Sequence, residues 1–136
     1  MFLDTSGLLC LHDSSDALHE DAMHAIHRAG RFLTHNYVLA ELVALAYARS
    51  LPRRPTLHFF RDLLGNPLVE VLWVDESFHL AGMDMLHRRA DKSYSLCDAI
   101  SFLQMQEHGI VEALTTDRHF EQEGLVRLLV SSMRDN

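Results

Sequence analysis

Five short apolar segments recur along this chain, and stretches with helical spacing separate them. The segments fall at residues 1–4, 31–34, 69–74, 110–116 and 125–130. They are largely apolar runs rather than strict alternations of apolar and polar residues, as expected for strands that helices cover on both faces. Strands that alternate with helices favour parallel pairing. We therefore predict an α/β fold in which a mainly parallel central sheet of about five strands is flanked by helices.

Start and stop signals define the helices between these strands. A helix is predicted over residues 15–29, and Gly30 is a suitable end for it. Thr34 or Asn36 is the expected cap of the following helix, which is apolar nearly all round and ends before Pro52, so we expect it to be buried. Further helices are predicted over residues 56–64, 76–90, 95–108 and 118–122.

Length and composition indicate one domain. The 136 residues, predicted to form a single domain over 1–136, are 48% hydrophobic and 23% charged, which is ordinary for a globular protein. No apolar run is long enough to span a bilayer, and the first residues lack the basic region and cleavage site of a signal peptide. We expect a cytoplasmic protein without membrane contact, in which Cys10 and Cys97 are reduced, packed thiols.

The net charge of −7 is unusual for a protein that binds nucleic acid. Any such contact must come from local basic patches. Two groups of basic residues are present, and each taken alone is interpreted as a solvated helix face: Arg49, Arg53, Arg54 and Arg61, and Arg88, Arg89 and Lys92.

Four acidic residues stand in apolar surroundings near predicted strand ends or helix starts. They are Asp4, Glu41, Asp98 and Asp117. A lone carboxylate is costly to bury, and ligands of parallel α/β sheets bind beyond the carboxyl ends of the strands. Four carboxylates gathered there would repel one another unless a cation held them. Hard oxygen ligands select Mg²⁺ or Mn²⁺, so we predict a divalent metal site and metal-assisted phosphate chemistry.

Each acid except one also has a purely structural interpretation. Asp4 and Asp117 are each placed to cap the helix that follows. Ser95 and Asp98 match a capping box with Asp in place of Glu. Glu41 has no such explanation, because it lies inside a predicted helix with almost no polar face. Glu41 is therefore the acid for which a functional role is the better hypothesis.

The order and spacing of four segments resemble the PIN domain family, most of all its VapC-type toxin ribonucleases. The segments are FLDTSGLL, NYVLAELVAL, ADKSYSLCDAISF and LTTDRHF, and they lie between residues 2 and 120. The resemblance implies a parallel sheet flanked by helices, with the four acids at the family's acidic positions. It also implies a second shell of hydroxyl residues that bond to these carboxylates or their waters: Thr5, Ser6 and Thr116.

In function, the resemblance implies Mg²⁺- or Mn²⁺-dependent hydrolysis of RNA phosphodiester bonds. Asp4, Asp98 and Asp117 would be metal ligands, and Glu41 would ligate the metal or orient a metal-bound water. It further implies that the chain is the toxin of a toxin–antitoxin pair, forms a homodimer and is neutralised by an antitoxin protein.

Other functions stay open at this point. One is a non-catalytic PIN-like module that binds RNA or protein. Another is a haloacid-dehalogenase-like phosphatase, although Ser6 stands where such an enzyme normally has its second Asp. The histidines do not form a zinc protease motif, because Met23 occupies the position four residues after His19. His119 is near Asp117, and a solvent-exposed loop histidine is the simpler interpretation of it.

Overall fold

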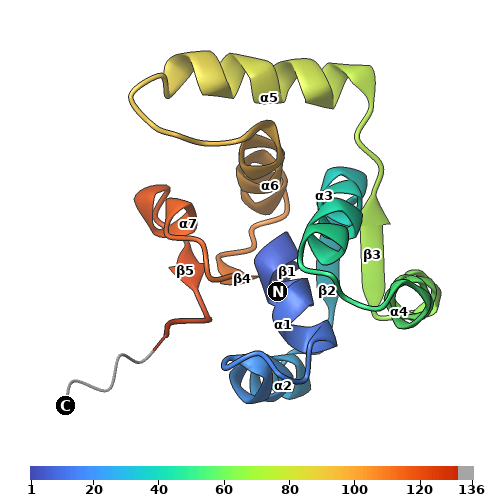
Figure 1. The fold of residues 1–136 in the computed structure, drawn as a ribbon. Coiled ribbons are helices and arrows are strands. Elements are labelled where there is room, and N and C mark those ends of the chain that lie inside the picture. The colour runs from blue at the N-terminus through green and yellow to red at the C-terminus, as the bar shows by residue number, and fades with distance from the viewer. Residues whose placement is uncertain (132–136) are drawn as a thin grey trace.

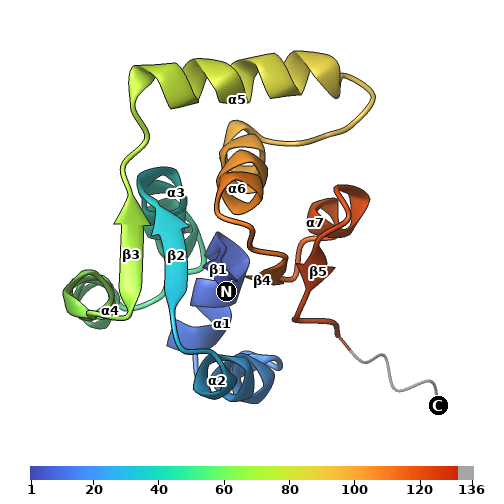
Figure 2. The ribbon, with the colours of Figure 1, turned by 180° about the vertical axis from the view of Figure 1, so that it is seen from behind.

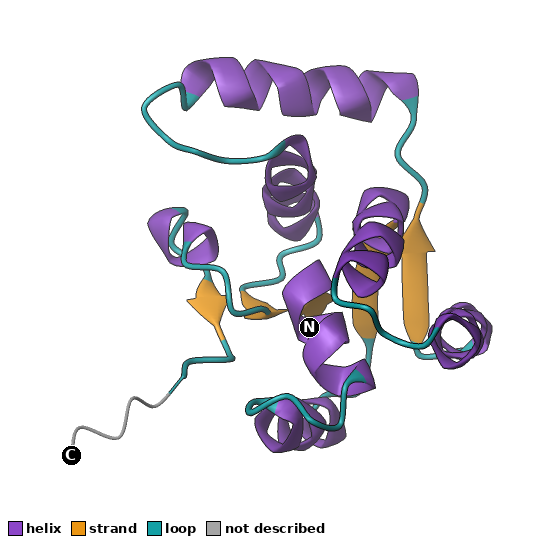
Figure 3. Ribbon diagram, viewed as in Figure 1, coloured by secondary structure: helices purple, strands orange, loops and turns teal. Residues whose placement is uncertain are grey.

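The computed structural model of the chain describes residues 1–131. Within these residues, helices surround a central set of short strands (Figure 3). In chain order the elements are β1 Phe2–Leu3, α1 Thr5–His12, α2 His19–Arg28, β2 Phe32–His35, α3 Asn36–Ala48, α4 Arg53–Gly65, β3 Val69–Leu72, α5 Glu76–Arg88, α6 Leu96–Glu107, β4 Glu112–Leu114, α7 His119–Gln122 and β5 Val126–Arg127. None of the described helices has the length and apolar character needed to cross a membrane.

The described strands form one sheet in the order β3-β2-β1-β4-β5, and every neighbouring pair is parallel. This confirms the predicted α/β class and the five-stranded parallel sheet. β1 lies in the middle, where Phe2 pairs with Leu33 of β2 and with Ala113 of β4. The two strands that border β1 therefore come from distant parts of the chain.

The strands are shorter than the apolar runs that predicted them. β4 and β5 are the clearest cases, with three and two residues. The chain nevertheless stays beside β4 after β5 ends, because Leu128 N–H donates to Ala113 O and Leu129 N–H donates to Thr115 O. The apolar run after β5 is thus buried against β4 at Leu129 without continuing as a regular strand.

His35 caps α3, and the sequence prediction of Thr34 or Asn36 was wrong. The Nδ1 atom of His35 accepts a hydrogen bond from Val38 N–H at 3.2 Å. Thr34 is still in β2, and its hydroxyl donates to Leu3 O instead. A histidine cap was not anticipated because capping preferences favour Ser, Thr, Asp and Asn.

α3 is buried on one face only, which corrects the prediction of a helix buried all round. Its buried residues follow helical spacing: Val38, Leu39, Leu42 and Ala46. Glu41, Val43 and Tyr47 are exposed, and Tyr47 has 80% of its surface accessible. The apolar residues of α3 therefore lie partly in the core and partly on the surface.

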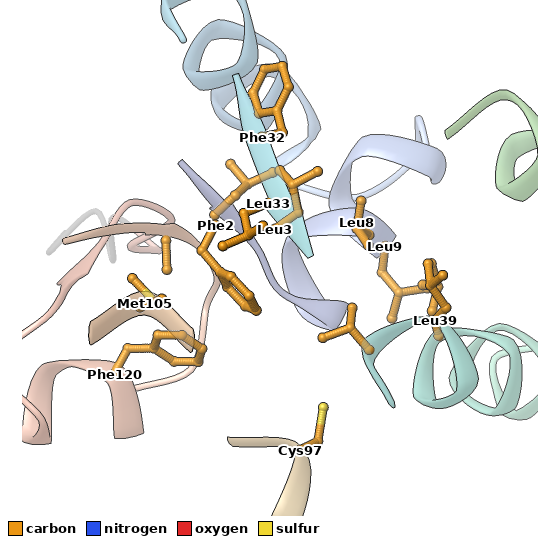
Figure 4. Packing of buried hydrophobic residues seen from close by; sticks show 14 of the residues in the cluster. Phe2, Leu3, Leu8, Leu9, Phe32, Leu33, Leu39, Cys97, Met105 and Phe120 are labelled. Carbon is orange, nitrogen blue, oxygen red and sulfur yellow. The ribbon is translucent and has the colours of Figure 1, made fainter. Parts of the chain in front are cut away.

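The core lies between the sheet and the helices around it, and its buried residues come from β1, β2 and β4 and from α1, α3 and α6 in particular. Phe2 lies near Phe120, with their ring centroids 6.3 Å apart (Figure 4). α1 passes very close to β4, since a Cβ atom at Gly7 would lie 2.0 Å from the carbonyl oxygen of Leu114. Glycine is therefore required where α1 crosses this strand.

The carboxyl ends of the strands point towards α5, which lies across that end of the molecule (Figures 1 and 2). α6 packs against α5 and runs back towards β4. α2 lies at the opposite end of the molecule (Figure 1). The fold therefore brings the residues after β1 and β4 and the first turn of α6 to one edge of the sheet.

Candidate metal centre

The four predicted acids are brought to this edge of the sheet by different elements. Asp4 follows β1 directly, Asp117 follows β4 after two threonines, Asp98 lies in the first turn of α6, and Glu41 lies in the second turn of α3. Their charges act on one another, as the pKa values below show. The charges of Asp98 and Glu41 act on Asp4, and the charge of Asp117 acts on Asp98; that these four residues hold a metal stays a prediction.

Asp4 is the most buried of the four, with 5% of its surface accessible. Its pKa is raised to about 7, mainly by burial and to a lesser extent by the charges of Asp98 and Glu41, while a hydrogen bond from Thr115 opposes the rise. Asp4 occupies the N-cap position of α1 but makes no side-chain capping hydrogen bond. The structural interpretation of this acid as a helix cap is therefore wrong.

Asp98 has both a structural and an electrostatic role. It completes the predicted capping box of α6: Ser95 N–H donates to Asp98 Oδ2 at 2.9 Å, and Asp98 N–H donates to Ser95 Oγ at 3.0 Å. Burial raises the pKa of Asp98, and the nearby charge of Asp117 raises it as well. The capping box therefore fixes the direction of the Asp98 carboxylate, and the charge of Asp117 still acts on it.

Glu41 differs from the other acids because its residue is exposed. The sequence argument for it relied on burial, and that part of the argument was wrong. Its charge still acts on the centre, since it adds to the raised pKa values of the Asp4 carboxyl and the Cys97 thiol, which are both raised mainly by burial. Glu41 is the acid most open to a ligand.

Thr115 connects the ends of β1 and β4, and sequence reasoning missed it. Its Oγ1 donates to Asp4 Oδ2 at 2.7 Å and accepts from Asp117 N–H at 3.0 Å. Its oxygen also lies 3.1 Å from Ser6 Oγ, which donates to Asp4 Oδ2 at 3.3 Å. Thr115 is completely buried. The sequence predicted that the hydroxyl of Thr116 would bond to the acids, but it is the hydroxyl of Thr115, one position earlier, that does so.

The other predicted hydroxyl residues lie around this network in different ways. Thr116 contributes its backbone N–H, which donates to Ser6 Oγ at 2.9 Å. The Oγ1 atom of Thr5 is buried and has no hydrogen-bond partner in the described part of the chain. The backbone of Thr5 acts on Asp4 by lowering the pKa of its carboxyl.

His119 lies between Asp98 and Asp117 rather than in open solvent. Its Nδ1 atom is 3.3 Å from Asp98 Oδ2 and 3.1 Å from Asp117 Oδ1. Its backbone N–H donates to Asp117 Oδ1 at 2.9 Å, so the turn before α7 brings both side chains to one place. Donor atoms of these three residues all lie within 4.8 Å of one another. The spacing of two residues between Asp117 and His119 is the feature of the sequence that could have predicted this position of His119.

Comparison with known proteins places this arrangement in a family. The family model for the PIN domain matches residues 1–124. This chain belongs to the PIN domain family. The match covers most of the chain, and it confirms the resemblance found in the sequence.

A solved structure is similar to this PIN domain over almost its whole length. It is VapC20 from Mycobacterium tuberculosis, described as a sarcin–ricin loop cleaving toxin. The two chains share 28% sequence identity and superpose with a TM-score of 0.83, covering 92% of this chain and 95% of VapC20. A search of curated protein sequences gave no match.

The charges of this PIN domain fit a divalent cation. Asp4 is buried, with its pKa raised to about 7 first by burial, and within residues 1–131 no Lys or Arg forms an ion pair with any of the four acids. His119 is the one basic side chain paired with them in that part of the protein. Asp4 is costly to ionise and is exposed to the charges of Asp98 and Glu41, and a bound cation would stabilise such a carboxylate.

Proposed function

We propose that this PIN domain is a divalent-metal-dependent ribonuclease that hydrolyses RNA phosphodiester bonds and acts as the toxin of a toxin–antitoxin pair. The observation that carries the proposal is the buried carboxylate of Asp4, which lies near Asp98 and Glu41 without a Lys or Arg partner among the described residues. The family match and the similarity to a ribonuclease toxin support the same activity.

The proposed roles follow from burial and hydrogen bonding. Asp4, Asp98 and Asp117 hold Mg²⁺ or Mn²⁺ with ionised oxygens. The carboxylate of Asp4 is positioned by Thr115, that of Asp98 by the capping box, and that of Asp117 by the backbone N–H of His119. Glu41 is exposed and orients a water or the substrate at the open side of the centre. When bound, the cation lowers the pKa of a water and stabilises charge on the phosphate.

Asp98→Asn tests the proposal, because the amide retains an oxygen that can accept from Ser95 N–H while the charge is lost. We expect RNA cleavage in the presence of Mg²⁺ or Mn²⁺ to fall by at least about a hundredfold, with helix content unchanged. Asp84→Asn is the matched control, since it removes one charge from an exposed position on α5. Full cleavage by the Asp98 variant would sink the assignment.

The substrate to test first is the sarcin–ricin loop hairpin, because the similar structure is described as cleaving that loop. An unstructured RNA of the same length and composition is the appropriate comparison. Cleavage of the hairpin alone would support a structured-loop specificity, and equal cleavage of both would limit the proposal to a general ribonuclease. Metal-dependent cleavage of neither RNA would favour the non-catalytic PIN-like module.

The phosphatase alternative is less well supported by the geometry. Such an enzyme would use the first Asp as a nucleophile, with a second Asp two residues later. Ser6 occupies that position, and its hydroxyl is held by Asp4 and Thr115. The residue therefore supports the orientation of Asp4 and supplies no acid.

The proposed protein partners are an antitoxin and a second copy of the chain. An apolar cleft between α3 and α4 offers a surface for such a contact, and its lining residues are Val43, Ala46, Tyr47, Leu51, Arg53, Thr56 and Leu57. Co-expression with the candidate antitoxin, followed by co-purification and an RNA cleavage assay, tests the first partner. Sedimentation of the isolated chain tests the second.

A further inference from the structure

His119 is fixed in the metal centre by contacts from three segments of the chain. Its backbone bonds to Asp117, and its Nδ1 atom lies against the carboxylates of Asp98 and Asp117. Its Nε2 atom lies 3.0 Å from Ser93 Oγ, in the loop between α5 and α6. The imidazole is therefore held on both nitrogens, and one of them faces the acids.

The spacing around Nδ1 is that of ligands around one ion. Adjacent ligands of an octahedral ion with bonds of roughly 2.1 Å lie about 3.0 Å apart, and tetrahedral ligands lie about 3.4 Å apart. The distances from Nδ1 to Asp98 Oδ2 and Asp117 Oδ1 are 3.3 and 3.1 Å. The imidazole nitrogen and one oxygen of each acid, which all lie within 4.8 Å of one another, can therefore converge on one cation.

The contact at Nε2 is compatible with a ring tautomer in which Nδ1 can bind a metal. Ser93 Oγ can accept the Nε2 hydrogen, and the neutral ring then carries its lone pair on Nδ1, towards Asp98 and Asp117. Histidines that bind metals usually donate their other ring N–H to an oxygen, which fixes the tautomer and the ring orientation. Ser93 supplies such an oxygen.

A second layer of contacts holds the ring plane. Tyr94 packs edge-on against His119, with ring centroids 5.3 Å apart and an interplanar angle of 71°. The hydroxyl of Tyr94 donates to Glu123 Oε1 at 2.9 Å, and Arg89 Nε donates to the same oxygen at 2.9 Å. Glu123 thus ties the segment that carries His119 to the loop that carries Tyr94.

We propose that His119 Nδ1 is a ligand of the divalent cation held by Asp98 and Asp117, and that this nitrogen makes the centre prefer Mn²⁺ to Mg²⁺. The inference rests on the proposed function, because it concerns the same metal. Mg²⁺ strongly prefers oxygen ligands, whereas transition metals accept imidazole nitrogen. The all-oxygen donor set predicted from the sequence carries no such preference by itself.

The test compares metal binding by wild-type protein and His119→Asn, both freed of metal beforehand. Isothermal titration with Mn²⁺ and with Mg²⁺ gives the two affinities. We expect the variant to lose at least about tenfold in Mn²⁺ affinity and to keep its Mg²⁺ affinity within about twofold. Equal losses for the two ions, or no loss for either, would overturn the proposal.

A spectroscopic measurement on the wild type does not depend on the variant folding. Electron spin-echo spectra of bound Mn²⁺ show nitrogen modulation when an imidazole is a ligand, and we expect that signal in the wild type. A spectrum without nitrogen modulation would mean that His119 only donates a hydrogen bond to the acids. His24→Asn, an exposed position on α2 at the far end of the molecule, is the control and should retain the signal.

RNA cleavage measured on the same samples separates this inference from the proposed function. Metal-dependent cleavage without nitrogen modulation would overturn the role of His119 alone. Nitrogen modulation without cleavage of any RNA would overturn the ribonuclease proposal and leave the histidine ligand in place.

Discussion

The hydroxyl of Thr115 donates a 2.7 Å hydrogen bond to the carboxylate of Asp4, a residue 111 positions earlier in the chain. This contact joins the end of β4 to the end of β1 at the candidate metal centre. Because the same oxygen accepts from Asp117 N–H, one buried hydroxyl sets the relative position of two proposed ligands.

Thr115→Val should therefore destabilise the protein and weaken its metal binding. The substitution keeps the shape of the side chain but removes the bonds to Asp4 and Asp117, at a cost of about 1–3 kcal/mol in the free energy of unfolding. Loss of the bond to Asp4 also raises the pKa of that carboxyl further. Urea denaturation and Mn²⁺ titration measure the two effects.

Thr116→Val is the matched control for this substitution. Thr116 contacts the network through its backbone N–H, which the change retains. We expect its free energy of unfolding to change by less than about 0.5 kcal/mol. Similar losses in the two variants would contradict the role given to Thr115.

Asp4→Asn should stabilise the metal-free protein at alkaline pH. The pKa of Asp4 is raised from 3.8 to about 7, so the folded state binds this proton more tightly than the unfolded state. Protonated Asp4 contributes to the free energy of unfolding in full below pH 4. This contribution, about 4 kcal/mol in total, is lost as the pH rises through 7. The Asn side chain of the variant does not titrate, so it adds no such pH dependence to the free energy of unfolding.

Thermal unfolding in chelator between pH 4 and pH 8 measures this difference. The variant should melt well above the wild type at pH 8 and close to it at pH 4. Saturating Mn²⁺ should reverse the order at pH 8, because only the wild type has the charge that binds it. A constant difference across the range would show that the charge of Asp4 is not its cause.

His35 should make the fold acid-sensitive. Burial lowers the pKa of His35 from 6.5 to about 3, so the unfolded state takes up a proton that the folded state does not. The contribution to stability is present above pH 6.5 and is lost as the pH falls towards 3, by about 1.4 kcal/mol per pH unit.

His35→Asn removes this titration while it keeps an oxygen that can cap α3. The variant should be less stable than the wild type at pH 7, because the bond from the ring to Ser101 is lost. Its free energy of unfolding should vary less between pH 6 and pH 4. Parallel pH profiles for the two proteins would assign the acid sensitivity to other groups.

Gly7→Ala should destabilise the fold strongly. The added Cβ would lie 2.0 Å from Leu114 O, a backbone atom that cannot rotate away. We expect a loss of about 3 kcal/mol or more in the free energy of unfolding, at the upper end of overpacking effects. At Gly30 the same substitution meets no atom within 4 Å, so Gly30→Ala should lie within about 0.5 kcal/mol of wild type.

Local patterns were sufficient to predict much of this fold. Apolar runs placed the strands, and the rule for ligand sites at strand ends placed Asp4 and Asp117 together. The capping box at Ser95 was predictable because it is written in four consecutive residues. In each case the determining interaction is local, or follows from parallel strands alone.

Features that depend on distant partners were not predictable in the same way. Thr115 and Thr116 differ only in which one faces Asp4, and that depends on how β4 pairs with β1. His119 faces the acids because the loop containing Ser93 and Tyr94 holds its ring. The exposure of Glu41 depends on which side of α3 other helices cover. None of these facts is visible in a local window of sequence.

The position of β1 in the sheet determines when, during protein synthesis, the candidate metal centre can form. β1 is made first, yet it can pair with β4 only after more than a hundred further residues have been added. The ribosome therefore releases the first acidic residue long before its hydrogen-bond partner exists. A nascent chain that lacks Thr115 cannot form the hydrogen bond to Asp4, so the candidate metal centre is complete only after the residues that follow β4 have been made.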